Sequence, residues 1–187
     1  MKLLRASDYK RMPWKNGGGE TVEIAVSPDG AGLAGFDWRV SMATVATDGP
    51  FSVFPGIDRT LSILEGEGMA LFIEGHEPKR LTQASDPLPF AADAPTSATL
   101  IDGTITDLNV MTRRGKLEHS VRRVGVAGLG ELVFHGEVAL VLCHRGQIDI
   151  GDQKLSAGDC LLIEAAAGKR HSASGAAQLF VIEIQAA

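Results

Sequence analysis

The position of Arg59 suggests chemistry more strongly than that of any other residue. Asp58 and Arg59 come immediately before the apolar run Leu61-Ser62-Ile63-Leu64, in a stretch bounded by Gly49-Pro50 and Gly66. Alternating apolar and small residues between Gly and Pro are typical of a strand and its turns. An arginine on a half-buried strand needs a partner, because an unpaired buried charge is costly. Arg59 is therefore the first candidate for binding a ligand.

A structural role for Arg59 is the alternative, in which it pairs with Asp58 or another carboxylate and only holds a turn. Neighbouring residues on a strand point to opposite faces, so Asp58 is poorly placed to satisfy Arg59. Structural ion pairs perturb charges as functional sites do, so spacing alone leaves both explanations open.

Several other residues could complete a site for a small acid. A guanidinium presents a planar fork that suits a carboxylate, and Arg39 on a second expected strand could converge with Arg59 on a dicarboxylate. Aromatic side chains would supply an apolar wall. The residues expected to bind the ligand on these grounds are Arg59, Arg39, Trp14, Asn16, Ser41 and Phe51. Solvent exposure is the competing expectation for Arg39 and Lys15.

The run Trp14-Lys15-Asn16-Gly17-Gly18-Gly19 permits two explanations. Consecutive glycines allow a close approach to the backbone amides, as in an anion-binding loop. No Lys-Ser/Thr follows them, however, and no helical pattern begins there, so the phosphate-loop signal is weak. The other explanation is a glycine-rich crossing between strands, with Trp14 packed underneath.

Signals for catalysis or metal binding are sparse. The histidines are His76, His119, His135, His144 and His171, and no two are separated by a single residue. A facial metal site needs several converging ligands, so we expect no metal and no other cofactor. No serine lies in a nucleophile elbow, and we assign no catalytic residue. A metal-free enzyme with a histidine base and a tyrosine acid would have to use Tyr9, the one tyrosine.

Composition limits the function classes. The 187 residues carry a net charge of −5 with both signs scattered. A chain of this length forms one large or two small domains and buries roughly 70% of its unfolded surface. The basic cluster from Arg113 to Arg123 is expected to be a solvated linker, and no nucleic-acid-binding motif accompanies it. Cys143 and Cys160 lie in apolar runs and are expected to be reduced and buried.

No window resembles a signal peptide or a membrane span, so we expect a cytoplasmic protein with no membrane partner. Many short strands with turns about every 8 to 12 residues indicate an all-β sandwich or barrel. The expected strands include 21–26, 38–45, 61–64, 68–75, 131–135, 138–144, 147–150, 160–163 and 178–184. A weak internal sequence repeat, in which Leu64 to Gly75 resembles Leu142 to Gly151, suggests two similar barrels.

A family resemblance adds to this pattern. The segment Leu155-Ser156-Ala157-Gly158-Asp159 before an apolar strand resembles the cupin superfamily of jelly-roll barrels. A longer match resembles the HutD/Ves family, with motifs between about residues 9 and 115. These motifs are Trp14-Lys15-Asn16-Gly17-Gly18-Gly19 with Thr21, Trp38-Arg39 with Ser41, Gly49-Pro50-Phe51-Ser52, Phe54-Pro55-Gly56 with Asp58-Arg59, and Asp107, Asn109, Met111 and Arg113.

The resemblance implies an all-β bicupin, that is, duplicated cupin (RmlC-like jelly-roll) barrels. Residues 1–115 would form the N-terminal barrel with the ligand site, and residues 116–187 a mainly structural half that exchanges strands with it and offers a homodimer surface. The resemblance adds Lys15 to the expected ligand-binding residues, which are then Arg59, Arg39, Trp14, Lys15, Asn16, Ser41 and Phe51. The implied function is non-catalytic and regulatory, in histidine utilisation, with a small acidic metabolite such as formylglutamate or urocanate as partner. Two alternatives stay open: a metal-free cupin enzyme acting on a small polar substrate, and an interaction module whose pocket is filled by its own side chains.

Overall fold

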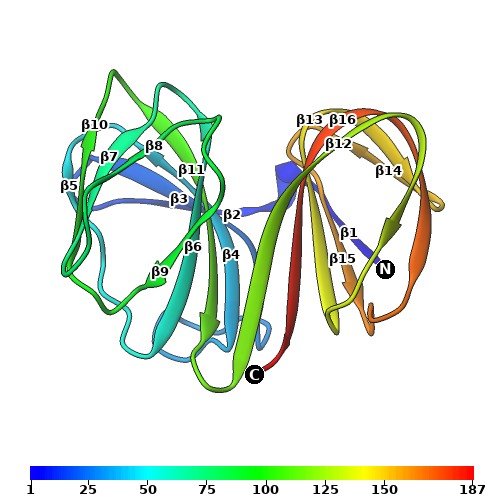
Figure 1. Ribbon diagram of the computed structural model, residues 1–187, viewed down its shortest axis with the longest axis horizontal. Coiled ribbons are helices and arrows are strands. Elements are labelled where there is room, and N and C mark those ends of the chain that lie inside the picture. Colours follow the sequence, from blue (N-terminus) through cyan, green and yellow to red (C-terminus); the bar gives the residue numbers. More distant parts are fainter. The chain divides into compact units, whose positions relative to one another are not determined.

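The chain is all-β in the computed structural model, which describes all of residues 1–187. Its only helix is the short 3-10 turn η1 (Ala6–Asp8). The chain divides into two compact units, the central unit (Lys10–Leu117) and the terminal unit (Met1–Tyr9 with Glu118–Ala187) (Figure 1). The expected all-β fold without a long helix is confirmed. That the two units are duplicated cupin barrels stays a prediction.

The central unit consists of two antiparallel sheets. The six-stranded sheet has the order β2-β3-β4-β11-β6-β9, and the four-stranded sheet the order β5-β10-β7-β8. The strands are β2 (Lys10–Pro13), β3 (Gly19–Ser27), β4 (Trp38–Val45), β5 (Gly49–Pro50), β6 (Ile57–Glu65), β7 (Met69–Ile73), β8 (Lys79–Leu81), β9 (Leu88–Ala91), β10 (Thr96–Leu100) and β11 (Ile105–Arg113).

One hydrophobic core joins the two sheets. It contains Ala43, Leu61 and Ile63 from the six-stranded sheet and Leu71 and Ala98 from the four-stranded sheet. Side chains alternate between the faces of a strand, so these residues define which face of the six-stranded sheet points inward. The inward face then also carries the residues two and four positions away on the same strands. This rule places Arg39, Ser41 and Arg59 inside the central unit.

The terminal unit is built from one six-stranded antiparallel sheet, in which β14 pairs with β13 beside the path β1-β15-β13-β16-β12. The strands are β1 (Lys2–Leu4), β12 (Leu117–Val133), β13 (Val138–Ile150), β14 (Gln153–Ser156), β15 (Cys160–Glu164) and β16 (Arg170–Ala186). The chain's first strand thus joins its C-terminal part, since Lys2, Leu3 and Leu4 pair with Leu162, Leu161 and Cys160. In Figure 1, β1 lies beside β15.

Two expectations for the terminal unit are wrong. The expected break between residues 144 and 147 does not exist, because β13 continues through it with a register shift between Cys143 and Arg145. Such a bulge bends a strand without ending it. Gly146 makes this possible, since it has a φ of +83° and any Cβ there would collide with the carbonyl of Ala176.

The basic cluster is also not a linker throughout, because its second part lies in β12, a strand of 17 residues. There Arg122 forms an ion pair with the carboxylate of Glu183 at 3.4 Å, and the Arg123 guanidinium lies 5.2 Å from the ring of Phe180. Alternating exposed and half-buried positions let one strand face carry charges in solvent while the other packs inward.

The terminal unit encloses a hydrophobic core, and its two buried carboxylates, Asp159 and Glu183, form ion pairs with Arg5 and Arg122. Its core contains Phe134, Val141, Ile150 and Leu161 among other aliphatic side chains. Cys143 and Cys160 are free and buried, as expected. The chain contains no helix with the length and hydropathy needed to cross a membrane.

Candidate functional site

A row of polar side chains lies on the inward face of the six-stranded sheet of the central unit. In the register of the sheet, Met111 on β11 lies between Arg39 on β4 and Arg59 on β6. Two residues further along β11, Asn109 lies between Ser41 and Leu61. Asp107 follows on the same face of β11. We call Glu23, Arg39, Ser41, Arg59, Asp107 and Asn109 the polar row.

Glu23 enters the polar row through a β-bulge in β3. The register between β3 and β4 shifts between Glu23, which pairs with Ser41, and Ala25, which pairs with Val40. A bulge adds one residue to one strand and re-aims the side chains around it. Glu23 and Val26 can therefore both pair with the inward residues Ser41 and Arg39, although they are three positions apart.

Arg39 and Glu23 form a buried ion pair. Arg39 Nε donates to Glu23 Oε2 at 2.8 Å, and the two side chains are 6% and 15% exposed. Removing one partner of such a pair leaves an uncompensated buried charge, which is strongly destabilising. The competing expectation of a solvent-exposed Arg39 is wrong, and its charge is already satisfied within the chain.

Arg59 makes no comparable ion-pair contact. The residue is 3% exposed, and its buried Nε has no hydrogen-bond partner. Its guanidinium carbon lies 5.3 Å from the ring centroids of Phe51 and Phe54 and 5.8 Å from that of Phe90. Burial lowers the pKa of Arg59 to about 10, an effect that Asp107 opposes and Arg39 reinforces. The aromatic rings stabilise the cation, but a hydrogen-bonding position on the guanidinium remains unused.

Asp107 is the carboxyl group that acts on Arg59. It is 1% exposed, and its Oδ1 accepts a hydrogen bond from Asn109 Nδ2 at 2.6 Å. Burial raises the pKa of Asp107 to about 7, although Arg59, the Asn109 amide and the backbone of Ala43 favour the charged form. A buried carboxyl that titrates near neutrality is uncommon and typical of functional sites.

Five of the expected ligand-binding residues line the core of the central unit. Arg39, Ser41 and Arg59 are buried in the polar row. Phe51 and Trp14 are partly buried and pack against the hydrophobic core that contains Ala43 and Leu61. The Trp14 indole also donates to the hydroxyl of Thr21 on β3 at 2.8 Å.

Lys15 and Asn16 do not join this cluster. Both are exposed, in the turn between β2 and β3. The side-chain oxygen of Asn16 accepts from Gly18 N–H at 2.9 Å, while Gly17 N–H donates to the carbonyl of Trp14. These amides hold the turn together. A Cβ on Gly19 would collide with the carbonyl of Thr44 and crowd the Trp14 ring, so the glycines serve the packing of Trp14.

Four residues next to Arg59 and Arg39 were not expected at the site. They are Glu23, Phe54, Phe90 and Asp107. Asn109, a motif residue that was not among the expected ligand-binding residues, also belongs to the polar row. Strand alternation over residues 105–111 could have predicted that Asp107 and Asn109 point inward, because they share one strand face with the apolar residues Ile105 and Met111. The bulge that admits Glu23 has no comparable signal.

Asp58 points away from Arg59, as strand alternation predicts. Its carboxylate accepts from Arg114 Nε at 2.8 Å, and Arg114 also contacts Asp93 at 3.0 Å through two nitrogens. Hydrogen bonds from Arg114 and Gly56 hold the pKa of Asp93 at about 2. This exposed network is independent of the buried polar row.

No three His, Cys, Asp or Glu side chains come together in an arrangement that could hold a metal ion. Tyr9, which the enzyme alternative would require, belongs to the terminal unit. Its hydroxyl donates to the carbonyl of Gly158 at 2.7 Å. Burial, followed by the effects of Cys160 and Asp159, raises the pKa of Tyr9 above its usual range. Tyr9 is thus a packed structural residue.

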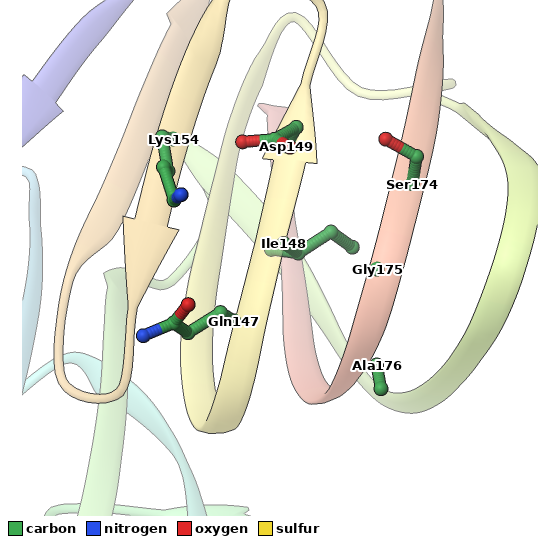
Figure 2. A pocket seen from close by; sticks show the side chains of 7 residues that line it. All are labelled: Gln147, Ile148, Asp149, Lys154, Ser174, Gly175 and Ala176. Carbon is green, nitrogen blue, oxygen red and sulfur yellow. The ribbon is translucent and has the colours of Figure 1, made fainter.

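The terminal unit has a surface hollow of about 340 Å³ between strands β13, β14 and β16. Figure 2 shows that its lining residues Gln147, Asp149 and Lys154 lie on neighbouring strands. Asp149 and Lys154 face each other in the strand register and are exposed. Because it has no buried polar group with an unmet hydrogen bond, this hollow is a weaker candidate than the polar row.

Comparisons with solved structures support the fold. YhhW from Escherichia coli matches with a TM-score of 0.73 at 10% identity, over 97% of this chain and 96% of that one. Oxalate decarboxylase from Lactobacillus farciminis matches with a TM-score of 0.66 at 10% identity, over 98% and 85%. At this identity the likeness concerns the fold alone, and it agrees with the expected cupin-like architecture.

More similar proteins identify the family. The HutD family model matches residues 6–181. An uncharacterized 21.2 kDa protein in the hutC 3' region of Pseudomonas putida is 35% identical over 88% of this chain and 87% of its own length. Protein Ves from Citrobacter koseri is 38% identical over 80% and 78%. HutD from Pseudomonas fluorescens SBW25 superposes with a TM-score of 0.86 at 34% identity, over 100% and 98%. The chain therefore belongs to the HutD family.

Proposed function

We propose that the central unit binds a small carboxylate in the polar row and acts as a non-catalytic, regulatory sensor in histidine utilisation. The name of the Pseudomonas putida relative and that of the family link the chain to a histidine-utilisation locus. Formylglutamate and urocanate are the ligands we propose, because each is a small acid of that pathway. The terminal unit, whose buried carboxylates Asp159 and Glu183 are already paired within the chain, has a structural role in this proposal.

The observation that carries the proposal is the unused hydrogen-bonding position of Arg59. Its Nε is buried and has no partner, so the chain holds a desolvated cation with incomplete compensation. Burying such a group lowers the free energy of unfolding, and natural proteins keep destabilising groups of this kind mainly at functional sites. A ligand carboxylate would supply a charge-assisted hydrogen bond to this guanidinium.

The surroundings of Arg59 suit a small ligand with one acidic and one apolar part. Phe51, Phe54 and Phe90 surround the guanidinium. Ser41 and Asn109 lie side by side in the register of the polar row and offer hydroxyl and amide groups. Small-molecule sites combine apolar walls with a few polar groups that fix orientation.

A metal-free enzyme is the second candidate, and Asp107 favours it. A carboxyl group with a pKa of about 7 could transfer protons at neutral pH. Incubating each acid with the purified protein and analysing it by chromatography separates the two functions. An unchanged acid supports the sensor, whereas turnover that is lost in Asp107→Asn would support the enzyme.

Isothermal titration calorimetry with formylglutamate, urocanate, glutamate and formate tests the proposal. Formate is a useful minimal probe, since HutD from Pseudomonas fluorescens SBW25 has been solved in a formate condition. We expect Arg59→Met to weaken binding by about 2 to 5 kcal/mol, or roughly 30-fold to several thousand-fold, because the variant loses the desolvated charge pair.

Arg114→Met is the matched control. Arg114 is also an arginine of the central unit, but its side chain is 42% exposed and already pairs with Asp58 and Asp93. Its replacement should leave the affinity within about twofold, since exposed ion pairs contribute little. Equal affinity of wild type and Arg59→Met would refute the assignment of Arg59. Absence of binding by all four acids would refute the proposed function.

A further inference from the structure

We propose that a carboxylate enters the polar row together with one proton, and that Asp107 accepts this proton. The inference rests on the proposed function and names a further residue of the same site. It makes the affinity of the protein for acids dependent on pH near neutrality. The argument depends on the charges inside the central unit, on the partners of each and on the burial of Asp107.

The polar row is neutral when all its ionisable groups are charged. Arg39 and Arg59 are the cations, and Glu23 and Asp107 are the carboxylates. A bound carboxylate would therefore leave one excess negative charge in a desolvated place. Burying an uncompensated charge is so unfavourable that a titratable group usually becomes neutral instead. One of the two carboxylates in the polar row should take up a proton.

The partners of the two carboxylates decide which one is protonated. Glu23 accepts a hydrogen bond from the Arg39 guanidinium at 2.8 Å, and that charged contact does not involve Arg59. Asp107 accepts a hydrogen bond from the neutral amide of Asn109 at 2.6 Å, and its attraction to a cation is to Arg59. A ligand carboxylate on Arg59 would offset that attraction. Asp107 therefore loses charge stabilisation when the ligand binds, whereas Glu23 keeps its partner.

No other ionisable group of the surrounding core competes for the proton. Along the polar row, Asp107 faces Ala43 on β4 and Ile63 on β6 in the sheet register. The facing sheet contributes apolar side chains to this core, namely Met69, Leu71, Ile73, Leu81 and Ala98. Asp107 is 1% exposed, so water cannot solvate its charge. Burial already raises the pKa of Asp107 to about 7, and occupation of Arg59 would raise it further.

Calorimetry with formylglutamate in buffers of different ionisation enthalpy measures the proton uptake, and formate serves as the single-carboxylate probe. Ordinary carboxyl groups have pKa values near 4, so both probes stay charged between about pH 6 and pH 8. With Asp107 titrating near pH 7 in the free protein, about one half to one proton should be taken up per bound formate at about pH 7.5, and at least as much per formylglutamate, which has two carboxylates. The dissociation constant should rise about tenfold from pH 6 to pH 8.

Asp107→Asn should abolish both the proton uptake and the pH dependence, because the amide is neutral at every pH. Its affinity at about pH 8 should equal or exceed that of wild type, since Arg59 no longer has a competing carboxylate. Asp149→Asn, which changes an exposed aspartate of the terminal unit in the same way, should behave as wild type.

The outcomes separate this inference from the proposed function. Binding that requires Arg59 but takes up no proton and is independent of pH would overturn the role of Asp107 and leave the sensor intact. Failure of formylglutamate, urocanate, glutamate and formate alike to bind would overturn both proposals. If Asp107→Asn does not fold, the wild-type measurement still tests the inference, because absence of proton uptake across the buffers would overturn it.

Discussion

Replacing Glu23 with Gln should lower the free energy of unfolding by about 3 to 5 kcal/mol, because it leaves the Arg39 guanidinium buried without a counter-charge. In the wild-type protein, Arg39 Nε lies 2.8 Å from the Glu23 carboxylate. Glutamine keeps the shape of the side chain and an oxygen that can accept from this Nε. The loss would therefore report the charge and not a cavity. Urea unfolding followed by circular dichroism at neutral pH measures it, with the slope of the transition as a check on two-state behaviour.

Two controls test the reason for this loss. Glu20, like Glu23, lies on β3, and it pairs with Arg11 on β2. The side chains of Glu20 and Arg11 are 28% and 64% exposed, so Glu20→Gln should change the free energy of unfolding by less than about 1 kcal/mol. Replacing Glu23 and Arg39 together with Met should restore most of the stability, since removing both buried charges is often neutral. A Glu23→Gln variant as stable as wild type would mean that water reaches Arg39 and that the polar row is not desolvated.

Strand alternation made the fold class and part of the site predictable. The sheets follow from period-two patterns such as residues 21–26 and 38–45, which became β3 and β4. The same rule separated Asp58 from Arg59 correctly, because adjacent residues on a strand face opposite sides. These predictions were right because strand alternation depends only on neighbouring residues of the same strand.

The errors arose where the geometry depends on distant parts of the chain. The bulge that brings Glu23 beside Arg39 is a feature of the pairing of β3 with β4, and no residue type in β3 predicts its position. β13 likewise passes through His144-Arg145-Gly146, a sequence typical of a turn, because its partner β16 continues alongside. A local reading assigns a turn to such residues, but the long-range ladder overrides it.

The candidate site shows the same division. Arg59 could be singled out because a charge entering an apolar strand is unusual wherever it lies. Of its aromatic surroundings, Phe51 was expected, but Phe54 in the same segment and Phe90 on β9 were not, and only the fold brings Phe90 to Arg59. Lys15 was expected at the site because of the family motif, and Asn16 also as a polar group for the ligand. In the structure both are exposed, and Asn16 supports the turn that lets Trp14 pack. A motif marks residues that matter together without saying which of them meet a ligand.

The second large effect concerns Asp107 and the dependence of stability on pH. Its pKa is raised from the ordinary aspartate range to about 7 by burial. Between about pH 4 and pH 7 the folded chain therefore binds more protons than the unfolded chain, so this residue lowers the free energy of unfolding as pH rises. A shift of about three units corresponds to about 4 kcal/mol. Asp107→Asn should therefore gain about this much stability relative to wild type across that interval, and the difference should stay constant above about pH 8.

Asp159 provides a control of opposite sign. Burial alone would raise its pKa, but hydrogen bonds from the backbones of Ser156 and Ala6 and from Arg5 lower it overall. The stability that Asp159 contributes is present above the ordinary aspartate pKa and is lost as pH falls through its lowered value. Asp159→Asn should therefore be less stable than wild type near neutral pH, and this difference should shrink on acidification.

The comparison of the two variants decides whether the folded protein destabilises the charged form of Asp107 or stabilises it. If Asp107→Asn followed the course of Asp159→Asn, the carboxylate would have a strong partner in the fold, and no proton would accompany a ligand. If it gained stability between about pH 4 and pH 7, the free protein would hold an unfavourable charge at neutral pH. An acid that binds Arg59 while Asp107 is protonated would then remove that charge, so the stabilisation of the protein by formylglutamate should be largest below about pH 7. Thermal unfolding with and without formylglutamate at about pH 6 and pH 8 measures that dependence.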